Sequence, residues 1–399
     1  MKSGKPHVLI VGGGIGGMAA ALALLQRGFD VDVFEQTGEL REIGAGIQIS
    51  PNGNRALHSL GVFENLKALS CPTEGKEVRH WKSGKTWRLF DLGGESIRKY
   101  GFPYMTVYRP DLLQVMADGV RRHKADAIHL GKRLAKIEQQ GASVTLLFED
   151  GSRAEGDALI GGDGVHSVVR RELFGDDPIR FSGMVAWRTL LPMKSLPAHM
   201  ARMVATNWIG PGGHVVHYPL QRGEVMNFVG TLEGATWDGP PWTAKATVAD
   251  CAAAFAGWND DVLAMIGRAS SVLKWAMLGR DFLEGWTVGR ATLLGDACHS
   301  TLPFLAQGAV MAIEDGVVLA RCLEAYDDVA TALQKYELAR KERTYRMVRG
   351  AADNTYRFHN RALAEPESAG VFIDREWNPE AIAARYEWLF TYDVDAAVI

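Results

Sequence analysis

A glycine-rich segment between an apolar run and a helical pattern constrains this fold more than any other feature. Residues 12–17, GGGIGG, fit the pattern G-x-G-x-x-G and follow the apolar run HVLIV. Gly12 permits a tight turn, Gly14 lets a pyrophosphate approach the backbone, and Gly17 allows the next helix to pack closely on the strand. With the second apolar run VDVFE, these elements form a βαβ unit of about thirty residues.

An acidic residue at the end of the second strand strengthens this prediction. Glu35 lies 21 residues after Gly14, where a carboxylate can accept hydrogen bonds from ribose hydroxyls. The free N–H groups and the positive dipole end of the helix would face the phosphates. A tight turn with a purely structural role is the alternative, but it does not account for the acid. The segment therefore predicts dinucleotide binding.

Buried strand patterns recur at three separated places in the chain. They lie near the N-terminus, near residue 160 in ALIGGDG and near residue 293 in ATLLGDA, with antiparallel-looking strands between them. We predict an α/β fold with a discontinuous Rossmann-like domain and an inserted antiparallel β-sheet substrate domain, followed by C-terminal helices. The expected nucleotide-binding segments are 1–75, 104–180 and 280–355, and the expected substrate-domain segments are 76–103 and 181–279. The aromatic-rich residues 356–399 would pack on the protein itself or on a second subunit, and the second arrangement would make a homodimer.

Composition excludes several classes of function. A net charge of −3 argues against a general affinity for nucleic acid. No segment offers the ~20 unbroken apolar residues of a membrane span, and five glycines interrupt the N-terminal run that imitates a secretory signal. The four cysteines are far apart without metal-ligand spacing, so we expect reduced thiols in a cytoplasmic protein and no metal site.

The segment GDACHSTLPFLAQG, residues 295–308, presents an ambiguity. Asp296, Cys298 and His299 could form a nucleophile with its base or part of a metal site. An apolar strand precedes them, and apolar residues at helical spacing follow Gly308. This context favours a support for a cofactor, in which Cys298 is a small packed side chain.

A second segment, GGDGVHSVVRREL at residues 161–173, also follows a predicted strand. Taken alone, it is equally compatible with a simple helix start at which Ser167 lies near the cap. Together with the other two motifs, in this order and at this spacing, it resembles the flavoprotein aromatic hydroxylases. These are single-component FAD-dependent monooxygenases related to 4-hydroxybenzoate hydroxylase, and the resemblance covers roughly residues 6–350. The stretches EIGAGIQISPNGNRALHSLG, YRPDLLQ and GDACHSTLPFLAQGAVMAIEDG look most similar to salicylate hydroxylase, 3-hydroxybenzoate 6-hydroxylase and 6-hydroxynicotinate 3-monooxygenase.

The resemblance implies which residues bind FAD. Some would hold its ADP half, some its ribityl chain and flavin ring, and Asp163 and Gly164 belong to a motif that the family uses for FAD and the nicotinamide cofactor together. Because Gly308 lies near a helix N-terminus, positive partial charge there would stabilise an anionic reduced flavin. The expected cofactor residues are Gly12, Gly14, Gly17, Glu35, Gln48, Arg109, Asp163, Gly164, Asp296, Gln307 and Gly308.

The resemblance also implies the reaction. NADH or NADPH docks transiently and reduces FAD, O2 adds to give a flavin C4a-hydroperoxide, and its distal oxygen attacks an aromatic ring activated by a hydroxyl group. The protein would orient the ring, exclude water and remove the phenol proton.

The proton-handling residues are expected in NWIGPGGHVVHYPLQ, residues 207–221. Strand alternation places His214 and Tyr218 on one face, about 13 Å apart at the backbone, with room for a small aromatic ring between them. Related hydroxylases carry an active-site histidine and tyrosine at matching positions. An unperturbed histidine titrates near neutrality and can assist deprotonation of a phenol. The alternative is a histidine and a tyrosine that only make ordinary structural hydrogen bonds.

The expected substrate is a small phenolic aromatic acid. Pro303, an expected substrate contact, replaces a glutamine of the 3-hydroxybenzoate 6-hydroxylase pattern, and Gln48 replaces a substrate-side histidine of the hydroxynicotinate enzyme. By subtraction, oxidative decarboxylation of salicylate to catechol is the leading prediction, with those two activities as alternatives. Arg188 is a candidate for binding the carboxylate, although we expect it to be a structural partner in the β domain.

Two further classes of function stay open. The same FAD-binding site could belong to a flavin epoxidase or to a hydroxylase of a larger natural product. A non-catalytic carrier with a nucleotide-binding fold is disfavoured by the glycines, Glu35 and Asp296. Elsewhere, a basic run on a late helix is expected to be a solvated face; its members are Arg340, Lys341, Arg343, Arg346 and Arg349.

Overall fold

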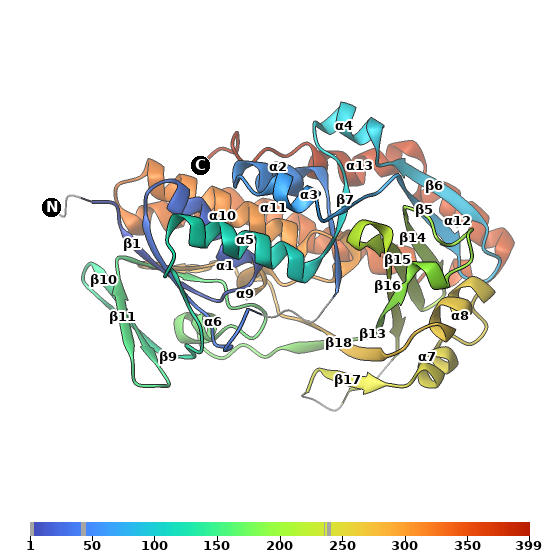
Figure 1. Cartoon of the computed structure of the whole chain (residues 1–399), viewed down its shortest axis with the longest axis horizontal. Coiled ribbons are helices and arrows are strands. Elements are labelled where there is room, and N and C mark those ends of the chain that lie inside the picture. Colours follow the sequence, from blue (N-terminus) through green and yellow to red (C-terminus); the bar gives the residue numbers. More distant parts are fainter. Residues whose placement is uncertain (1–3, 41–44, 235, 238–240) are drawn as a thin grey trace.

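The computed structural model describes residues 4–40, 45–234, 236–237 and 241–399. Two large sheets lie toward opposite ends of the molecule, with long helices running between them (Figure 1). The six-stranded sheet has the order β19 (Thr287–Val288), β20 (Ala291–Leu293), β12 (Ala158–Gly161), β1 (His7–Val11), β2 (Asp30–Phe34) and β8 (Ile128–His129). Its strands come from three separated stretches of the chain, which confirms the predicted discontinuous Rossmann-like fold.

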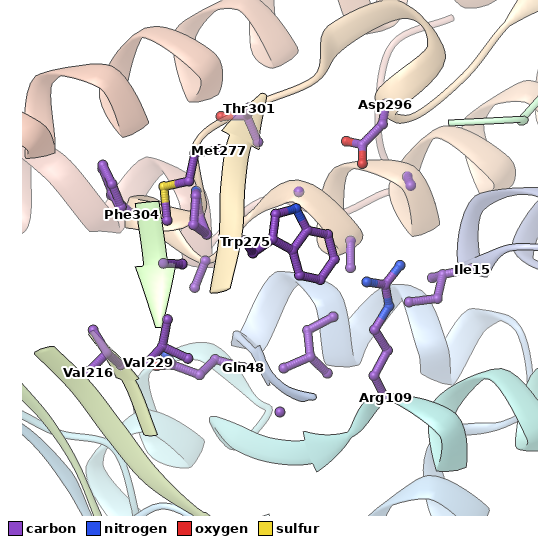
Figure 2. A pocket seen from close by; sticks show the side chains of 18 of the residues that line it. Ile15, Gln48, Arg109, Val216, Val229, Trp275, Met277, Asp296, Thr301 and Phe304 are labelled. Carbon is purple, nitrogen blue, oxygen red and sulfur yellow. The ribbon is translucent and has the colours of Figure 1, made fainter. Parts of the chain in front are cut away.

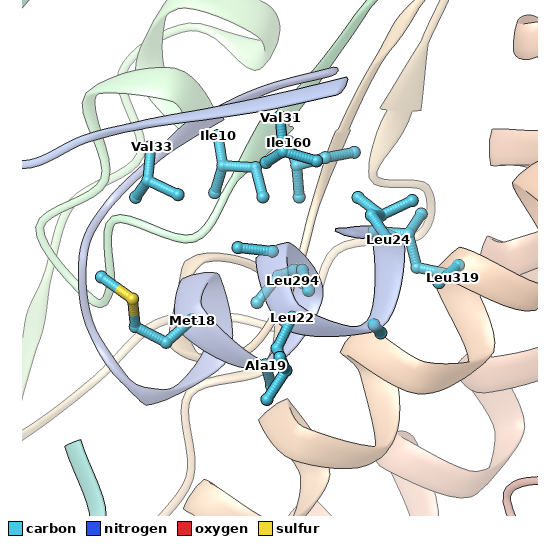
Figure 3. Packing of buried hydrophobic residues seen from close by; sticks show 14 of the residues in the cluster. Ile10, Met18, Ala19, Leu22, Leu24, Val31, Val33, Ile160, Leu294 and Leu319 are labelled. Carbon is cyan, nitrogen blue, oxygen red and sulfur yellow. The ribbon is translucent and has the colours of Figure 1, made fainter. Parts of the chain in front are cut away.

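The predicted βαβ unit is formed by β1, α1 (Ile15–Gln26) and β2. Ile10 in β1 lies opposite Val33 in β2 and Ile160 in β12, in parallel register. Met18 and Leu22 of α1 are buried against these strands (Figure 3). Burial on both faces explains why the strands read as continuous apolar runs. This packing fixes the glycine-rich turn at the carboxyl edge of the sheet.

The eight-stranded sheet carries one face of the site described below. Its order is β17 (Thr243–Ala246), β18 (Val272–Gly279), β13 (Arg180–Pro192), β16 (Val225–Glu233), β15 (Gly213–Leu220), β14 (Val204–Gly210), β5 (Gly75–His80) and β6 (Thr86–Asp91). The expectation of an antiparallel sheet needs one correction, because β14 and β5 pair in parallel. These two strands are joined by a long crossover through the other domain, as parallel pairing requires, instead of a hairpin.

Smaller elements connect and flank the two sheets. One three-stranded sheet has the order β3 (Gly46–Ile49), β7 (Met105–Tyr108) and β4 (Cys71–Pro72), and the other has β11 (Arg153–Gly156), β10 (Ser143–Phe148) and β9 (Leu134–Gln140). The connecting helices are α2 (Pro51–Ser59), α3 (Phe63–Lys67), α4 (Gly94–Tyr100), α5 (Arg109–His123), α6 (Val168–Phe174), α7 (Val248–Ala254), α8 (Asp260–Gly267) and α9 (Asp296–His299). Pro110 lies in the first turn of α5, where its missing N–H has no cost.

The C-terminal segment packs on the chain's own body. It follows α10 (Gly308–Ala325) and α11 (Val329–Phe358) and contains α12 (Pro366–Glu376) and α13 (Pro379–Phe390). Phe372 and Trp377 join a buried cluster with Val78 of the large sheet, whereas Phe390 packs near Tyr104. Of the two arrangements expected for this aromatic segment, the structure therefore displays intramolecular packing.

The basic run on α11 is not uniformly a solvated face. Arg346 and Arg349 are exposed, but Arg340 is fully buried, with Nε 2.7 Å from Asp315 and Nη2 2.8 Å from Glu314. The prediction was wrong for Arg340, and also for Arg343, whose side chain is 9% exposed and bonds Glu314. The reason is that α11 packs against α10, whose two consecutive acids are also buried. Sequence spacing along one helix does not reveal the acids on its neighbour.

Two observations bear on the cellular environment. All four cysteines are buried and form no disulfide. Over the residues that the structure describes, every helix is too short or too polar to cross a lipid bilayer.

Candidate active site

A cavity of about 400 Å³ lies where the large sheet meets the Rossmann-like domain. Figure 2 displays Ile15, Asp296 and Arg109 at one end and Phe304 and Val216 at the other, with Trp275 between them. Nine predicted site residues line this one cavity: Gly14, Gln48, Arg109, Gly164, His214, Tyr218, Asp296, Pro303 and Gly308. The other five predicted residues do not line it: Gly12, Gly17, Glu35, Asp163 and Gln307.

The glycine turn forms one wall of the cavity, and its glycines are required for two different reasons. A Cβ on Gly17 would lie 1.9 Å from the carbonyl oxygen of Gly12, and one on Gly12 would lie 2.4 Å from that of Gly162. Gly12 also has a φ of +107°, which only glycine adopts easily. Gly14 differs, because a Cβ there would meet no atom within 4 Å and would project into open space. Gly12 and Gly17 shape the turn, whereas Gly14 keeps its surface accessible.

Glu35 closes this turn from behind. Its Oε2 accepts a hydrogen bond of 2.7 Å from the Gly13 N–H, and its Oε1 accepts bonds from the N–H and hydroxyl of Thr37. The carboxylate is half-buried, and each oxygen keeps further acceptor capacity. Acceptance of ribose hydroxyls by Glu35 stays a prediction.

Asp163 is turned away from the cavity and caps α6. Its carboxylate accepts hydrogen bonds from the Ser167 hydroxyl and from the N–H groups of Val168 and Val169. Ser167 in turn accepts from the N–H of Arg170 at 2.8 Å, as a simple helix start predicts. Asp163 therefore holds the loop in which Gly164, with a φ of +76°, borders the cavity.

The N-termini of two helices face the cavity without a side-chain cap. α1 begins after Gly14 and α10 after Gln307, and neither N-cap residue makes a side-chain capping bond. The Gln307 side chain instead bonds Ser50 and Asn52 and does not line the cavity, whereas Gly308 and Ala309 do. Two sets of free N–H groups and two positive dipole ends suit an anionic, phosphate-bearing molecule.

Three further predicted residues line the space between these helix ends and the large sheet. Asp296 extends into the cavity, where its carboxylate is exposed although it lies deep in the protein. Burial lowers the pKa of Arg109, and the charge of Asp296 partly offsets this effect. Arg109 projects toward the cavity from the start of α5 (Figure 2). Gln48 is oriented by the Tyr104 hydroxyl, which donates to its Oε1 at 2.9 Å.

Cys298 and His299 are structural residues of the cofactor-side wall. Cys298 is buried, and burial raises the pKa of its thiol, so it is no thiolate nucleophile. His299 Nε2 lies 2.7 Å from Asp315, which also accepts from Arg340 and from the Gly295 N–H. This buried network anchors α9 to α10. The expectation that Cys298 is a small packed side chain is confirmed.

At the other end of the cavity, β15 presents His214 and Tyr218 on one face, as the alternation predicts. The Tyr218 ring lies against the backbone of Gly46, where a Cβ would come within 2.5 Å of it. Burial raises the pKa of Tyr218, so its phenol is neutral. The His214 ring packs edge-on against Phe304, with centroids 4.7 Å apart.

His214 is the first member of a chain of three side chains that leads out of the cavity. Its Nδ1 lies 2.6 Å from Nε2 of His359, and Nδ1 of His359 lies 2.7 Å from Oε1 of Glu233. The Glu233 side chain is 43% exposed. The expectation of an unperturbed histidine was wrong, because burial, helped by His359 and Lys76, lowers the pKa of His214 well below its ordinary value.

These contacts determine the tautomers of both histidines. A carboxylate only accepts, so His359 donates through Nδ1 and its Nε2 accepts. His214 must then donate through Nδ1, which leaves the lone pair of its Nε2 available to a molecule in the cavity. A neutral imidazole held in this orientation is a general base.

Sequence reasoning missed several residues of the substrate end. His359 and Glu233 lie 126 residues apart, and neither belongs to a motif. Lys76, Asn207 and Thr231 also line the cavity. Asn207 and Thr231 each keep a buried side-chain oxygen without a hydrogen bond among the described residues. Alternation along β5, β14 and β16 could have indicated which face of its own strand each side chain occupies. Only the order of the strands in the sheet shows that these faces lie beside His214.

Comparison with known proteins identifies the family. The FAD binding domain family matches residues 5–351, and 3-amino-4-hydroxybenzoate 2-monooxygenase of Streptomyces platensis is 38% identical over 89% of each chain. The chain is an FAD-dependent monooxygenase. Other relatives of this monooxygenase are 6-hydroxynicotinate 3-monooxygenase of Pseudomonas fluorescens, 36% identical over 89% of this chain and 92% of the relative, and 3-hydroxybenzoate 6-hydroxylase of Polaromonas naphthalenivorans, 34% identical over 97% and 96%. Among solved structures, a salicylate hydroxylase substrate complex superposes with a TM-score of 0.82 at 25% identity, covering 99% of this chain and 97% of the other.

The residues present fit FAD, the cofactor of this monooxygenase. Gly14 leaves the space that a pyrophosphate needs, and the uncapped start of α1 offers N–H groups to it. Arg109, Asp296 and the start of α10 border the adjoining part of the cavity. The predicted family, the cofactor and the aromatic hydroxylase chemistry are therefore confirmed.

Proposed function

We propose that this monooxygenase hydroxylates a small phenolic aromatic carboxylic acid, with His214 as the base that removes the phenol proton. The observation that carries this proposal is the oriented chain from His214 Nε2 through His359 to Glu233, which begins at the cavity. The relatives support the substrate class, since each is named for a hydroxylated aromatic acid.

The protein contributes orientation, exclusion of water and proton transfer. Phe304, Val216 and Val229 supply apolar surface at the substrate end, and Trp275 borders the space between the two ends. A phenol hydroxyl placed at His214 Nε2 becomes a better electron donor to its ring as its proton is removed. Bound FAD, reduced by NADH or NADPH, supplies the activation of O2.

The proton can leave the cavity along the same chain. When Nε2 of His214 accepts the phenol proton, its Nδ1 can pass a proton to Nε2 of His359. His359 then releases its Nδ1 proton to Glu233, whose carboxylate contacts solvent. Because both imidazoles are neutral before the reaction, the chain is ready to accept one proton.

Tyr218 and the remaining predicted residues have supporting roles in this proposal. The neutral Tyr218 hydroxyl is available to hold the substrate, and Pro303 limits the cavity beside Phe304. On the cofactor side, we propose that Gly12, Gly14, Gly17, Glu35, Asp163 and Gly164 shape and contact the nucleotide half of FAD. Gln48, Arg109, Asp296, Gln307 and Gly308 would support its flavin half.

The candidate substrates differ in their support. Among the aromatic acids, 3-amino-4-hydroxybenzoate is the first choice, because the relative named for it is 38% identical to this chain. Salicylate, 3-hydroxybenzoate and 6-hydroxynicotinate are the other candidates, and turnover of salicylate stays a prediction from the sequence. The cavity must hold the flavin end of FAD as well as the substrate within about 400 Å³, which favours one small ring over a large natural product.

The test is turnover of the FAD-loaded protein with these four acids. NADH or NADPH oxidation is followed by absorbance, and the product is identified by chromatography and mass spectrometry. At least one acid should accelerate cofactor oxidation and give a product that has gained an oxygen atom. If no acid does either, the proposed substrate class is wrong.

We also propose that the chain divides as the sequence predicted, with segments 1–75, 104–180 and 280–355 forming the FAD-binding domain. The remaining segments 76–103 and 181–279 would form the substrate domain, and 356–399 a packing segment. The sheets support this division, because all strands of the eight-stranded sheet lie within residues 75–91 and 180–279. Four buried, unpaired thiols support a reducing, cytoplasmic environment, and a homodimer stays a prediction.

A further inference from the structure

Lys76 is a buried cation at the substrate end of the cavity. It lies on β5 with only 9% of its surface exposed, and it lines the cavity. Within the described part of the chain, its ammonium group makes no hydrogen bond and no ion pair. Glu77, the next residue, points to the opposite face of the strand and pairs with Arg79 and Arg202.

The surroundings of Lys76 do not compensate for its charge. Beyond the cavity, the Lys76 side chain borders a small void with Phe90, Leu92, Leu305 and Tyr104, which are apolar or neutral. Burial lowers the pKa of Lys76 to about 8, so the group is still largely cationic at neutral pH. A buried cation without a partner opposes folding. A molecule that brings a negative charge into the cavity would remove this cost.

Lys76 lies at the end of the cavity that we assign to the substrate. Its charge helps to lower the pKa of His214. Another cation that lines the cavity, Arg188, stacks on Trp275 with 5.0 Å between Cζ and the ring centroid, and its charge acts on Arg109 and on Tyr218. Arg188 therefore already has an aromatic partner for its charge, whereas Lys76 has none among the described residues.

We infer that Lys76 binds the carboxylate of the aromatic acid by a charge-assisted hydrogen bond, and thereby selects acids over their neutral analogues. This inference rests on the proposed function, because it assigns a second anchor to the same substrate. The carboxylate at Lys76 and the phenol at His214 would fix the ring at two points. Two fixed points determine which ring carbon faces the flavin.

Binding to the FAD-loaded protein tests this inference without turnover. The probes are 3-amino-4-hydroxybenzoate and 3-amino-4-hydroxybenzamide, which differ in charge but hardly in shape. Dissociation constants are measured by calorimetry for wild type and for Lys76→Met, which keeps the length of the side chain. Wild type should prefer the acid, and Lys76→Met should bind the acid about 10- to 100-fold more weakly with little change for the amide.

A matched variant and folding controls distinguish loss of the Lys76 charge from a general effect of removing a lysine and from misfolding. Lys82→Met, at an exposed lysine just after the same strand, should leave both dissociation constants unchanged. FAD content and melting temperature report folding, and Lys76→Gln replaces Lys76→Met if the latter fails to fold.

Three outcomes would overturn the inference: equal weakening for acid and amide, loss of acid preference in Arg188→Met but not in Lys76→Met, or binding of neither probe by wild type. Turnover of the four acids is a separate measurement. An acid preference that depends on Lys76 without any oxygenated product would refute the proposed function and leave the carboxylate site standing. Oxygenation of an acid whose binding does not depend on Lys76 would support the proposed function and refute the carboxylate site at Lys76.

Discussion

His214 and His359 share a hydrogen bond of 2.6 Å between Nδ1 and Nε2, although 145 residues separate them in the chain. His214 belongs to the large sheet and His359 directly follows α11. The bond therefore joins the substrate face of the sheet to the long C-terminal helix. Since Glu233 fixes the tautomer of His359, it also orients the base at the cavity through His359.

Replacement of His214 should abolish efficient hydroxylation but leave FAD bound. His214→Ala removes the general base, and such groups contribute about 10²- to 10⁴-fold to rates. We expect product formation to fall within that range, while NADH oxidation continues with release of hydrogen peroxide. Product and peroxide are measured together.

A histidine on the other face of the same strand gives the control. His217 is buried, and its pKa is lowered to about 3, but it does not line the main cavity. His217→Asn should therefore keep the ratio of product to NADH consumed. Full coupling in His214→Ala would exclude the proposed role of His214.

Two substitutions at His359 separate orientation from proton transfer. Glutamine at this position can accept from His214 Nδ1 but cannot relay a proton onward, whereas alanine does neither. We expect His359→Ala to lower the hydroxylation rate at least about 10-fold and His359→Gln to have a smaller effect. Single-turnover product formation as a function of pH distinguishes the two. Equal rates in wild type and both variants would show that the chain of histidines carries no proton.

Substitution of two glycines of the same motif should affect different properties, FAD affinity at Gly14 and stability at Gly17. The Cβ of Gly14→Ala projects into the cofactor space without a clash, so FAD affinity should fall at least about 10-fold while the melting temperature of the apoprotein changes little. The Cβ of Gly17→Ala would lie 1.9 Å from the Gly12 carbonyl oxygen, so this variant should lose about 1–3 kcal/mol or more of stability. FAD titration and thermal unfolding measure the two effects. Similar melting temperatures for both apoproteins would contradict this assignment.

The buried acid Asp315 should contribute strongly to stability. It bonds His299 and Arg340, and all three side chains are fully buried. Asp315→Asn removes the carboxylate partner of His299 and leaves Arg340 paired with Glu314 alone, which costs about 3–5 kcal/mol. Denaturant unfolding measures this loss. Glu149→Gln, which breaks an exposed pair with Arg133, should cost no more than about 1 kcal/mol.

The same group predicts a dependence on pH. Burial opposes the charge of Asp315, but His299 and Arg340 outweigh it and hold the pKa of Asp315 at about 2, below its ordinary 3.8. Because the folded pKa is depressed, the stabilisation is complete above about pH 4 and is lost as the pH falls toward 2. The difference in stability between wild type and Asp315→Asn should therefore shrink over this interval. A constant difference would contradict the role of the carboxylate charge.

Acid binding should weaken as the pH rises through about 8. Burial sets the pKa of Lys76 near that value, and loss of its proton removes the charge that attracts a carboxylate. The other groups around it stay neutral, because burial raises the pKa values of Tyr104 and Tyr386 and lowers that of His214. The dissociation constant of 3-amino-4-hydroxybenzoate should rise above pH 8 in wild type, with a flat profile for Lys76→Met.

The sequence by itself determined the parts of this protein that local geometry dictates. Gly12, Gly14 and Gly17 require their residue type because backbone atoms approach them or a ligand must, so the cofactor site could be recognised in a short segment. Alternation along one strand was likewise enough to place His214 and Tyr218 on one face. These properties depend on neighbours along the chain.

The tertiary structure decided which charges are compensated. The sequence gives no signal that Arg340 is neutralised by Asp315, that His359 orients His214, or that Lys76 lacks a partner. These partners lie 25 and 145 residues apart or are absent from the described residues altogether. Burial and pairing are properties of the assembled interior. Desolvation there makes the presence or absence of a partner change the stability of the fold and the pKa of the buried group. The cofactor site was therefore readable from motifs, whereas the chemistry of the substrate end emerged only when the sheet and the C-terminal helices came together.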